Sequence, residues 1–392
     1  MRRISALFLA LLLLALIGGC STDDEQSRPP QLGVGAEDEQ AAEKLGFPST
    51  ATRNTIRVGG SDATSDAAGV AGALYPATGD SDRPTAIALV DKDDWATAVA
   101  ASVLVGRPIG APILLSDGRD LPAVSEDVLE RLKPKGSDLS KDAQVIRVGP
   151  DVARPDGFKT AVIEGDDPFE RAAAIDRFFS AARARPSNDV VLYSADDAEF
   201  AMPAAAWAAR SGDAVLPIRR DAVPAPILKT LREHERPNVF VLGPESVISK
   251  KVLDQLKKQK LARSVNRIEG PNPVENAIAF ARYEKGDFGW GVVVPGYNFT
   301  LASTKRPADA AAAAALATRG VFAPLLLSDD AATMPPKLEE YFLSVQPGYE
   351  DDPGQAVYNR AWILGDDKAI SIDQQAQLDQ LTELIPVQSN AP

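Results

Sequence analysis

The chain has 392 residues, and 55 acidic against 42 basic side chains give it a formal net charge of -13. This charge argues against binding to nucleic acid and against nonspecific adhesion to anionic lipid. At roughly 150 residues per domain the length predicts two or three domains. The apolar fraction of 45% is ordinary for globular cores.

The N-terminus has the pattern of a cleaved export signal. Arg2 and Arg3 precede an apolar run over residues 6–17, and small residues follow it. The run is shorter than the roughly 20 residues that span a bilayer as a helix. The segment Ile17-Gly18-Gly19-Cys20 resembles the lipobox of bacterial lipoproteins, which implies cleavage after residue 19 and diacylglyceryl attachment to the Cys20 thiol. The alternative is a plain secretory signal with an incidental cysteine.

Residues 20–54 follow the predicted signal peptide of residues 1–19 and show no apolar periodicity. They contain two adjacent prolines and an acidic cluster at residues 37–39. Such a composition is typical of a solvated linker. We therefore expect the lipidated cysteine and this linker to hold the folded part away from the membrane.

From residue 55 onward four markers recur in the same order. The first is a short strand that ends in glycine, and Gly60, Gly165 and Gly270 are spaced 105 residues apart. The second is an apolar strand followed by an aromatic residue and an alanine-rich helix, with strands at 86–90, 190–193 and 292–294. The third is a strand that begins at proline, at 112–116, 217–220 and 324–328. The fourth is a strand that closes on glycine, at 145–150, 239–244 and 362–366.

This order predicts three α/β units. The strands are continuous apolar runs, which is typical of a sheet covered on both faces. Their alternation with helices predicts right-handed parallel crossovers. The repeat units are expected at residues 55–158, 159–263 and 264–388. Amphipathic helices are expected after the third marker, at 124–132, 225–232 and 336–343.

The ordered markers resemble the cell wall-binding repeat 2 family over residues 55 to about 387. The resemblance implies three tandem flavodoxin-like or Toprim-like units with parallel sheets in a pseudo-threefold arrangement. It also implies noncovalent binding to anionic cell-wall polysaccharide, through the segment that reads Pro-Ile-Leu-Leu in the first unit. The polymer-binding residues carried over are Pro112, Ile113, Leu114, Leu115, Pro217, Ile218, Pro324, Leu325, Leu326 and Leu327.

The sequence departs from the family pattern at three places, one of which is the second glycine of Leu-Gly-Gly, replaced by Pro150, Pro244 or Asp366. The aspartate that usually follows the aromatic residue is replaced by Thr97, Met202 or Leu301. The arginine of the Asp-Arg-x-x-Thr-Ala motif is absent from the first and third copies, which have Ala63 and Pro273 near that point. We also expect no second functional domain beside the repeats.

Catalytic chemistry finds little support. His234 is the sole histidine and lies in a charged helix end, where we expect an exposed side chain rather than a catalytic base. With one histidine and one cysteine, a zinc site or a Ser-His-Asp triad is not expected. No complete glycine-rich nucleotide motif is present. We expect no catalytic residue, no metal site and no cofactor.

Two charged patterns allow alternatives. Aspartates after the strands, such as Asp91 and Asp94, are interpreted as helix N-caps, with a calcium or magnesium site as the alternative. The lysine-rich segment 250–263 is interpreted as a solubilising helix face, with a polymer-docking patch as the alternative.

The main hypothesis is a noncatalytic lipoprotein, anchored to the extracytoplasmic face of the cell membrane through Cys20, that binds cell-wall polysaccharide. The alternative is an envelope scaffold that recruits another envelope protein. A hydrolase of envelope polymer ranks lowest, because no matched acid and base can be named.

Overall fold

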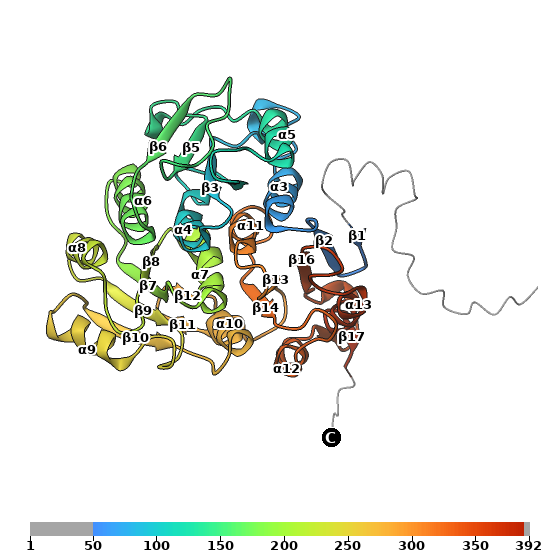
Figure 1. Cartoon of the computed structure of the whole chain (residues 1–392). Helices are drawn as coiled ribbons and strands as arrows, with labels where there is room; N and C mark the ends of the chain where they lie inside the picture. Colours follow the sequence, from blue (N-terminus) through green and yellow to red (C-terminus); the bar gives the residue numbers. More distant parts are fainter. Residues whose placement is uncertain (1–49, 388–392) are drawn as a thin grey trace, which may run out of the picture. The chain divides into compact units, whose positions relative to one another are not determined.

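A computed structural model describes residues 50–387, which contain eleven α-helices, α3 to α13, and three larger β-sheets (Figure 1). The predicted signal peptide, Cys20 and most of the linker lie outside these residues. Within residues 50–387 no helix is both long and apolar enough to cross a membrane.

The three sheets share one strand order. The first runs β4 (Ile113–Ser116), β3 (Ile87–Asp91), β5 (Val145–Val148) and β6 (Thr160–Ile163). The second runs β8 (Ala214–Ile218), β7 (Asp189–Ser194), β9 (Asn238–Leu242) and β10 (Ser264–Ile268). The third runs β14 (Leu325–Ser328), β13 (Asn298–Ser303), β16 (Arg360–Leu364) and β2 (Thr55–Val58), with β1 (Thr50–Ala51) antiparallel at its edge. All other pairings in these sheets are parallel, which confirms the predicted α/β class.

The strand that opens each sequence repeat lies in another repeat's sheet. Strands β6 and β10 complete the sheets of the preceding repeats. Strand β2 completes the third sheet, where Ile56 is the partner of Trp362 (Figure 1, blue beside red). The chain therefore passes through the third sheet, at β2, before it enters the first sheet, and so connects the two. The boundaries of the repeats as sequence units stay a prediction.

Three central helices pack against one another. These are α4 (Trp95–Ala101), α7 (Ala198–Ser211) and α11 (Asp309–Leu316), and one apolar core contains residues of all three. Their alanines let the backbones approach closely. At Gly106, which follows the 3-10 helix η2 (Ser102–Val105), an added Cβ would lie 2.5 Å from the carbonyl oxygen of Ala209.

Each opening strand is followed by a helix that packs on the next sheet. These helices are α3 (Ala63–Leu74), α6 (Pro168–Ala182) and α10 (Pro273–Arg282). They contact the edge strands β4, β8 and β14, respectively. They also contact the central helices α11, α4 and α7, and we call these three helix pairs the joints of the fold.

The joints place different side chains at equivalent positions. Asp66, Arg171 and Asn276 are spaced 105 residues apart on α3, α6 and α10. Strand register pairs Ala88 with Ile113 as it pairs Thr300 with Leu325. Counted along the chain from these matched strands, Asp309 is the equivalent of Thr97. In the middle copy, the strands β7 and β8 make Phe200 the equivalent residue. The expected family positions at Met202 and Leu301 are therefore wrong, and the third copy keeps its aspartate.

Ion pairs cross the first two joints. Arg306 lies with Nη1 3.3 Å from Asp66 Oδ2 and donates through Nη2 to Asp366 Oδ1 at 2.7 Å. Arg171 lies with Nη2 2.8 Å from Asp94 Oδ2 and donates from Nε to Thr97 Oγ1 at 3.0 Å. The third joint has no such pair at these positions among the described residues, and Asn276 Oδ1 accepts from the Gly270 N–H at 3.2 Å.

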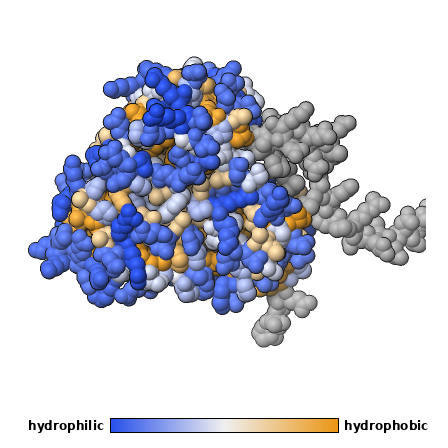
Figure 2. All heavy atoms as spheres, viewed as in Figure 1, coloured by the Kyte–Doolittle hydropathy of each residue, from blue (hydrophilic) through white to orange (hydrophobic). Residues whose placement is uncertain are grey.

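The helices after the third marker lie close to where the sequence predicts them, at α5 (Ala123–Leu132), α8 (Ala225–Glu233) and α12 (Pro336–Ser344). Helix α9 (Lys250–Lys258) buries Val252 and Leu256 and leaves its lysines exposed, as expected. The last helix is α13 (Ile372–Leu381). Polar residues cover most of the face that Figure 2 shows, with apolar residues between them.

The strand expected at residues 292–294 is wrong. Val293 and Val294 are 57% and 53% exposed and lie in a loop after the hairpin of β11 (Glu284–Lys285) and β12 (Phe288–Gly289). Gly291 has a positive φ of 62°, and Pro295 lacks an N–H for a sheet, so the apolar triplet has no strand partner. The true strand is β13, which contains Phe299.

Candidate functional site

The residues predicted to bind polymer are buried in or beside three edge strands. This holds for Pro112, Ile113, Leu114, Leu115, Pro217, Ile218, Pro324, Leu325, Leu326 and Leu327. In the middle copy Pro217 pairs with Tyr193 as Leu115 pairs with Val90, so Pro217 takes the place of Leu115, not that of Pro112. The side chains of these segments pack in the core, and polar residues follow each strand.

Some of the aspartates after the strands serve as helix caps. The Asp94 carboxylate accepts from the Thr97 N–H at the start of α4, and Asp167 accepts from the Phe169 and Glu170 N–H groups at the start of α6. The N-cap interpretation is confirmed at these two positions, whereas Asp91 accepts from the Asp93 and Gly118 N–H groups instead. Within residues 50–387 no group of three or more histidine, cysteine or acidic side chains is placed to hold a metal ion.

His234 is buried, so its expected exposure is wrong. Its Nε2 lies 2.9 Å from Asp176 Oδ2, and its Nδ1 lies 2.8 Å from the Ser187 carbonyl oxygen. Burial lowers the pKa of His234, but the hydrogen bond and charge of Asp176 outweigh burial, and the pKa is raised. The side chain links the end of α8 to α6 and to Ser187. The charged residues beside it in the sequence predict an exposed position, so the sequence does not indicate this role.

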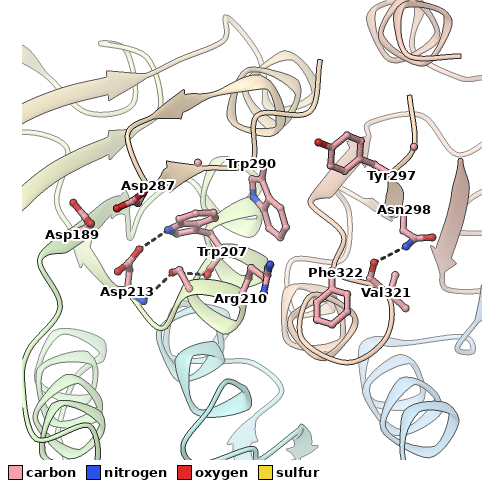
Figure 3. Close-up of a pocket in the computed structure, with 13 residues that line it drawn as sticks. Asp189, Trp207, Arg210, Asp213, Asp287, Trp290, Tyr297, Asn298, Val321 and Phe322 are labelled. Atoms are coloured by element: carbon pink, nitrogen blue, oxygen red, sulfur yellow. Dashed lines mark hydrogen bonds between the residues drawn. The ribbon is translucent and has the colours of Figure 1, made fainter. Parts of the chain in front are cut away.

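A cleft of about 600 Å³ lies at the amino ends of β7 and β13, and we call it the aromatic cleft. Figure 3 shows its labelled side chains, which are Asp189, Trp207, Arg210, Asp213, Asp287, Trp290, Tyr297, Asn298, Val321 and Phe322. They come from the end of α7, the β11–β12 hairpin and the segments before β13 and β14. Trp207 lies in the alanine-rich helix of the second marker, and the other labelled residues belong to no motif that the sequence singles out.

One wall is built on Trp207. Its indole Nε1 donates to Asp213 Oδ2 at 2.9 Å, and Asp213 Oδ1 also accepts from Ser187 Oγ at 2.5 Å. Burial raises the pKa of Asp213, with the hydrogen bonds acting against it. Helix α7 ends at Gly212 with φ of 74°, a left-handed cap that turns the chain toward Asp213. Trp290, half-buried, packs edge-on against Trp207 with ring centres 5.6 Å apart.

The facing wall carries exposed rings on a fixed backbone. Tyr297 is 36% exposed and Phe322 is 48% exposed. The Gly296 and Tyr297 N–H groups both donate to Asn359 Oδ1. The Nδ2 of the same asparagine donates to the Val345 carbonyl at 2.7 Å. Asn298 Nδ2 donates to the Val321 carbonyl at 2.7 Å (Figure 3). These bonds hold both rings against the mouth of the cleft.

The chemistry of the aromatic cleft suits a hydroxylated ring. Flat aromatic faces cover apolar C–H groups, while carboxylate and amide oxygens accept hydrogen bonds from hydroxyls. Three carboxylates line the cleft against one cation, Arg210, which lies over Phe322 at 5.1 Å. This balance favours a neutral or amino sugar over an anionic one.

The comparisons with known proteins agree with this fold. The sequence matches the family model of cell wall binding domain 2 (CWB2) at residues 162–253 and 267–374. No curated protein matches it. Cwp8 from Clostridium difficile is 20% identical with a TM-score of 0.63, over 88% of this chain and 54% of that chain. Cwp6 from Clostridium difficile is 16% identical with a TM-score of 0.63, over 84% of this chain and 48% of that chain.

This chain therefore spans about half the length of the solved structures it matches. At these identities the likeness concerns the fold. The two segments matched by the family model make up just over half of the sequence. The chain belongs to the cell wall binding domain 2 family.

Proposed function

We propose that the protein is a noncatalytic, lipid-anchored envelope protein that binds cell-wall polysaccharide, with sugar rings held in the aromatic cleft. Membership of the cell wall binding domain 2 family supports the role. The observation that supports the proposal most is the cleft itself, which is lined by the rings of Trp290, Tyr297 and Phe322. Ring packing or backbone hydrogen bonds hold these residues in place. Preorganised rings lose little entropy on binding.

The anchor rests on the sequence of the N-terminus. Cys20 carries the diacylglyceryl group, and residues 20–54 separate the folded part from the extracytoplasmic membrane face. Two acyl chains give stable attachment where one gives marginal attachment. Mass spectrometry of the membrane-extracted protein should find a lipidated Cys20, and Cys20→Ala should move the protein out of the membrane fraction. An unmodified cysteine in membrane-bound protein would contradict this part.

The Pro-Ile-Leu-Leu segments contribute to polymer binding by position. Their side chains are buried, and in the third copy the segment that begins at Pro324 follows shortly after Val321 and Phe322 in the chain. The buried segment therefore fixes the part of the chain that carries these two residues of the aromatic cleft.

The test is sedimentation of residues 21–392 with delipidated cell wall from the host bacterium. Wild type should be retained in a saturable way. Trp290→Ala with Tyr297→Ala should weaken retention about thirtyfold or more, because each of the two aromatic contacts with a ligand ring contributes roughly 1–3 kcal/mol. Leu343→Ala removes a side chain that is 53% exposed on α12, outside the cleft, and is the control.

Equal retention of the double variant would remove the cleft from the proposal. No retention of wild type would contradict wall binding and favour an envelope scaffold. That alternative has one observation of its own, the exposed apolar side chains of Val293, Val294, Val357 and Tyr358. Cross-linking in cells that captures a protein through these side chains would support it, and release of sugars from the wall would contradict the noncatalytic role.

A further inference from the structure

A second cleft shares Phe322 with the aromatic cleft but has the opposite charge. Its volume is about 630 Å³, and we call it the basic cleft. Four cations line it, Arg83, Arg107, Lys135 and Arg319, and none of its lining residues is acidic. A cleft of this kind is unexpected in a chain with a net charge of -13.

The cations come from four segments that hydrogen bonds hold together. Arg107 follows η2, and Arg319 follows α11. Lys135 follows α5, and its N–H donates to the Pro84 carbonyl at 3.1 Å, beside Arg83. The fold therefore gathers these side chains at the ends of two central helices, although no cluster is visible in the sequence.

The charges in the basic cleft are only partly compensated. Arg83 pairs with Asp80 at 3.0 Å, and the Arg319 guanidinium lies 4.4 Å from the centre of the Tyr75 ring. Arg107 and Lys135 are exposed and have no acidic partner among residues 50–387. Arg83 Nε is a buried donor without an acceptor, a state that favours a ligand oxygen at this place.

The lysine-rich helix α9 gives the contrast. Lys250 pairs with Asp254 at 2.6 Å, and Lys251 lies 3.6 Å from Asp221. Lys250 and Lys251 therefore already have carboxylate partners, whereas Lys257 and Lys258 have no ion pair among residues 50–387 and lie on an exposed helix face. Salt screens charges on such a face, so the helix is a poorer anion site than the basic cleft.

We propose that the basic cleft binds a phosphate group of a polyanionic wall polymer whose sugar occupies the adjoining aromatic cleft. Guanidinium groups present paired N–H donors that match phosphate oxygens, and Lys135 adds a point charge. Phe322 lines both clefts, which are therefore adjacent. A neutral sugar ring can lie in the aromatic cleft while the phosphate linked to that ring lies in the basic cleft. The inference rests on the proposed function and adds the place at which the negative charge of the ligand is held.

The experiment is isothermal titration calorimetry with soluble poly(glycerol phosphate) at two salt concentrations. Arg107→Ala with Lys135→Ala removes two exposed, unpaired cations, so we expect unchanged thermal unfolding. Affinity should fall about tenfold or more, and the salt dependence should become shallower. Lys257→Ala with Lys258→Ala removes the same charge from the exposed end of α9 and should leave affinity unchanged.

Equal loss in the two double variants would show a diffuse field effect and overturn the site. No loss in the cleft variant would overturn it as well. If wild type binds wall but not poly(glycerol phosphate), the inference fails and the proposed function stands. If wild type binds poly(glycerol phosphate) through the cleft but not the wall, the anion site stands and the proposed function fails.

Discussion

The joint between α3 and α11 and the joint between α6 and α4 place charge at the same positions with opposite sign. The first has Asp66 on the outer helix and Arg306 before the central helix. The second has Arg171 on the outer helix and Asp94 before the central helix. The difference teaches that, at the two joints whose outer helix is charged, the segment before the central helix carries the opposite charge, and either side can supply either sign.

The two joints are not equally balanced. Where the second joint has Thr97, the first has Asp309, which is fully buried close to Asp66. Burial raises the pKa of Asp66 to about 6, and burial together with the charge of Asp66 raises the pKa of Asp309 well above its usual range. The joint that contains the N-terminal strand and helix therefore carries surplus acid.

The largest expected effect is that of Arg306→Ala. It leaves Asp66 and Asp366 without their shared cation, and removing one partner of a buried pair costs about 3–5 kcal/mol. Urea denaturation should show this loss in the free energy of unfolding. A loss below about 1 kcal/mol would mean that the first joint does not depend on its ion pair.

Arg171→Ala should destabilise less, by about 2 kcal/mol, although it removes an ion pair and two hydrogen bonds. The reason is that Asp94 is 20% exposed at its side chain and keeps the Thr97 N–H as a partner. The same denaturation measurement checks it. A loss larger than that of Arg306→Ala would reverse our ranking of the joints.

The surplus acid predicts a pH dependence of the free energy of unfolding that arises at the first joint. Both native pKa values lie above the unfolded value of about 4, so the native state holds protons that the unfolded state has released. Stability from this site should therefore fall as pH rises from about 4 through about 6. Asp309→Asn should flatten this slope and stabilise the protein at pH 7 by about 1–2 kcal/mol. An unchanged slope would contradict the assignment.

The smallest effect is expected at the third joint. Asn276→Ala loses the 3.2 Å hydrogen bond from the Gly270 N–H but also removes a buried Nδ2 that has no acceptor. These effects oppose each other, and we expect a change of about 1 kcal/mol or less. A larger loss in the free energy of unfolding, measured by urea denaturation, would show that the uncharged third joint stabilises the fold as much as a charged joint does.

The sequence predicts the α/β class well, because apolar strand runs and amphipathic helices have different periods. It does not predict that β2 joins β16, since a repeat period says nothing about which sheet receives a strand. The strand expected at residues 292–294 fails because three valines satisfy the apolar pattern while their flanking glycine and proline exclude pairing.

The sequence does not indicate the aromatic cleft or the basic cleft, for a different reason. Trp207 lies in an alanine-rich helix and is typical of a core residue, while Trp290 and Tyr297 lie in irregular segments without a motif. The cations of the basic cleft come from segments far apart in the chain. Only the tertiary fold brings such groups together, so composition and spacing cannot reveal them.

The pairing of β2 with β16 has a consequence for circular permutation. The Asn54 N–H donates to Asp379 Oδ1 at 2.7 Å and Arg57 Nε to Gln375 Oε1 at 2.9 Å, so β2 and the last helix, α13, lie side by side. A chain reopened at Gly157, before β6, and relinked between residues 387 and 50 would keep the same neighbours throughout. We therefore expect each of the three opening strands to be able to serve as the N-terminal one, and the natural order decides which sheet follows the proposed membrane tether of residues 20–54.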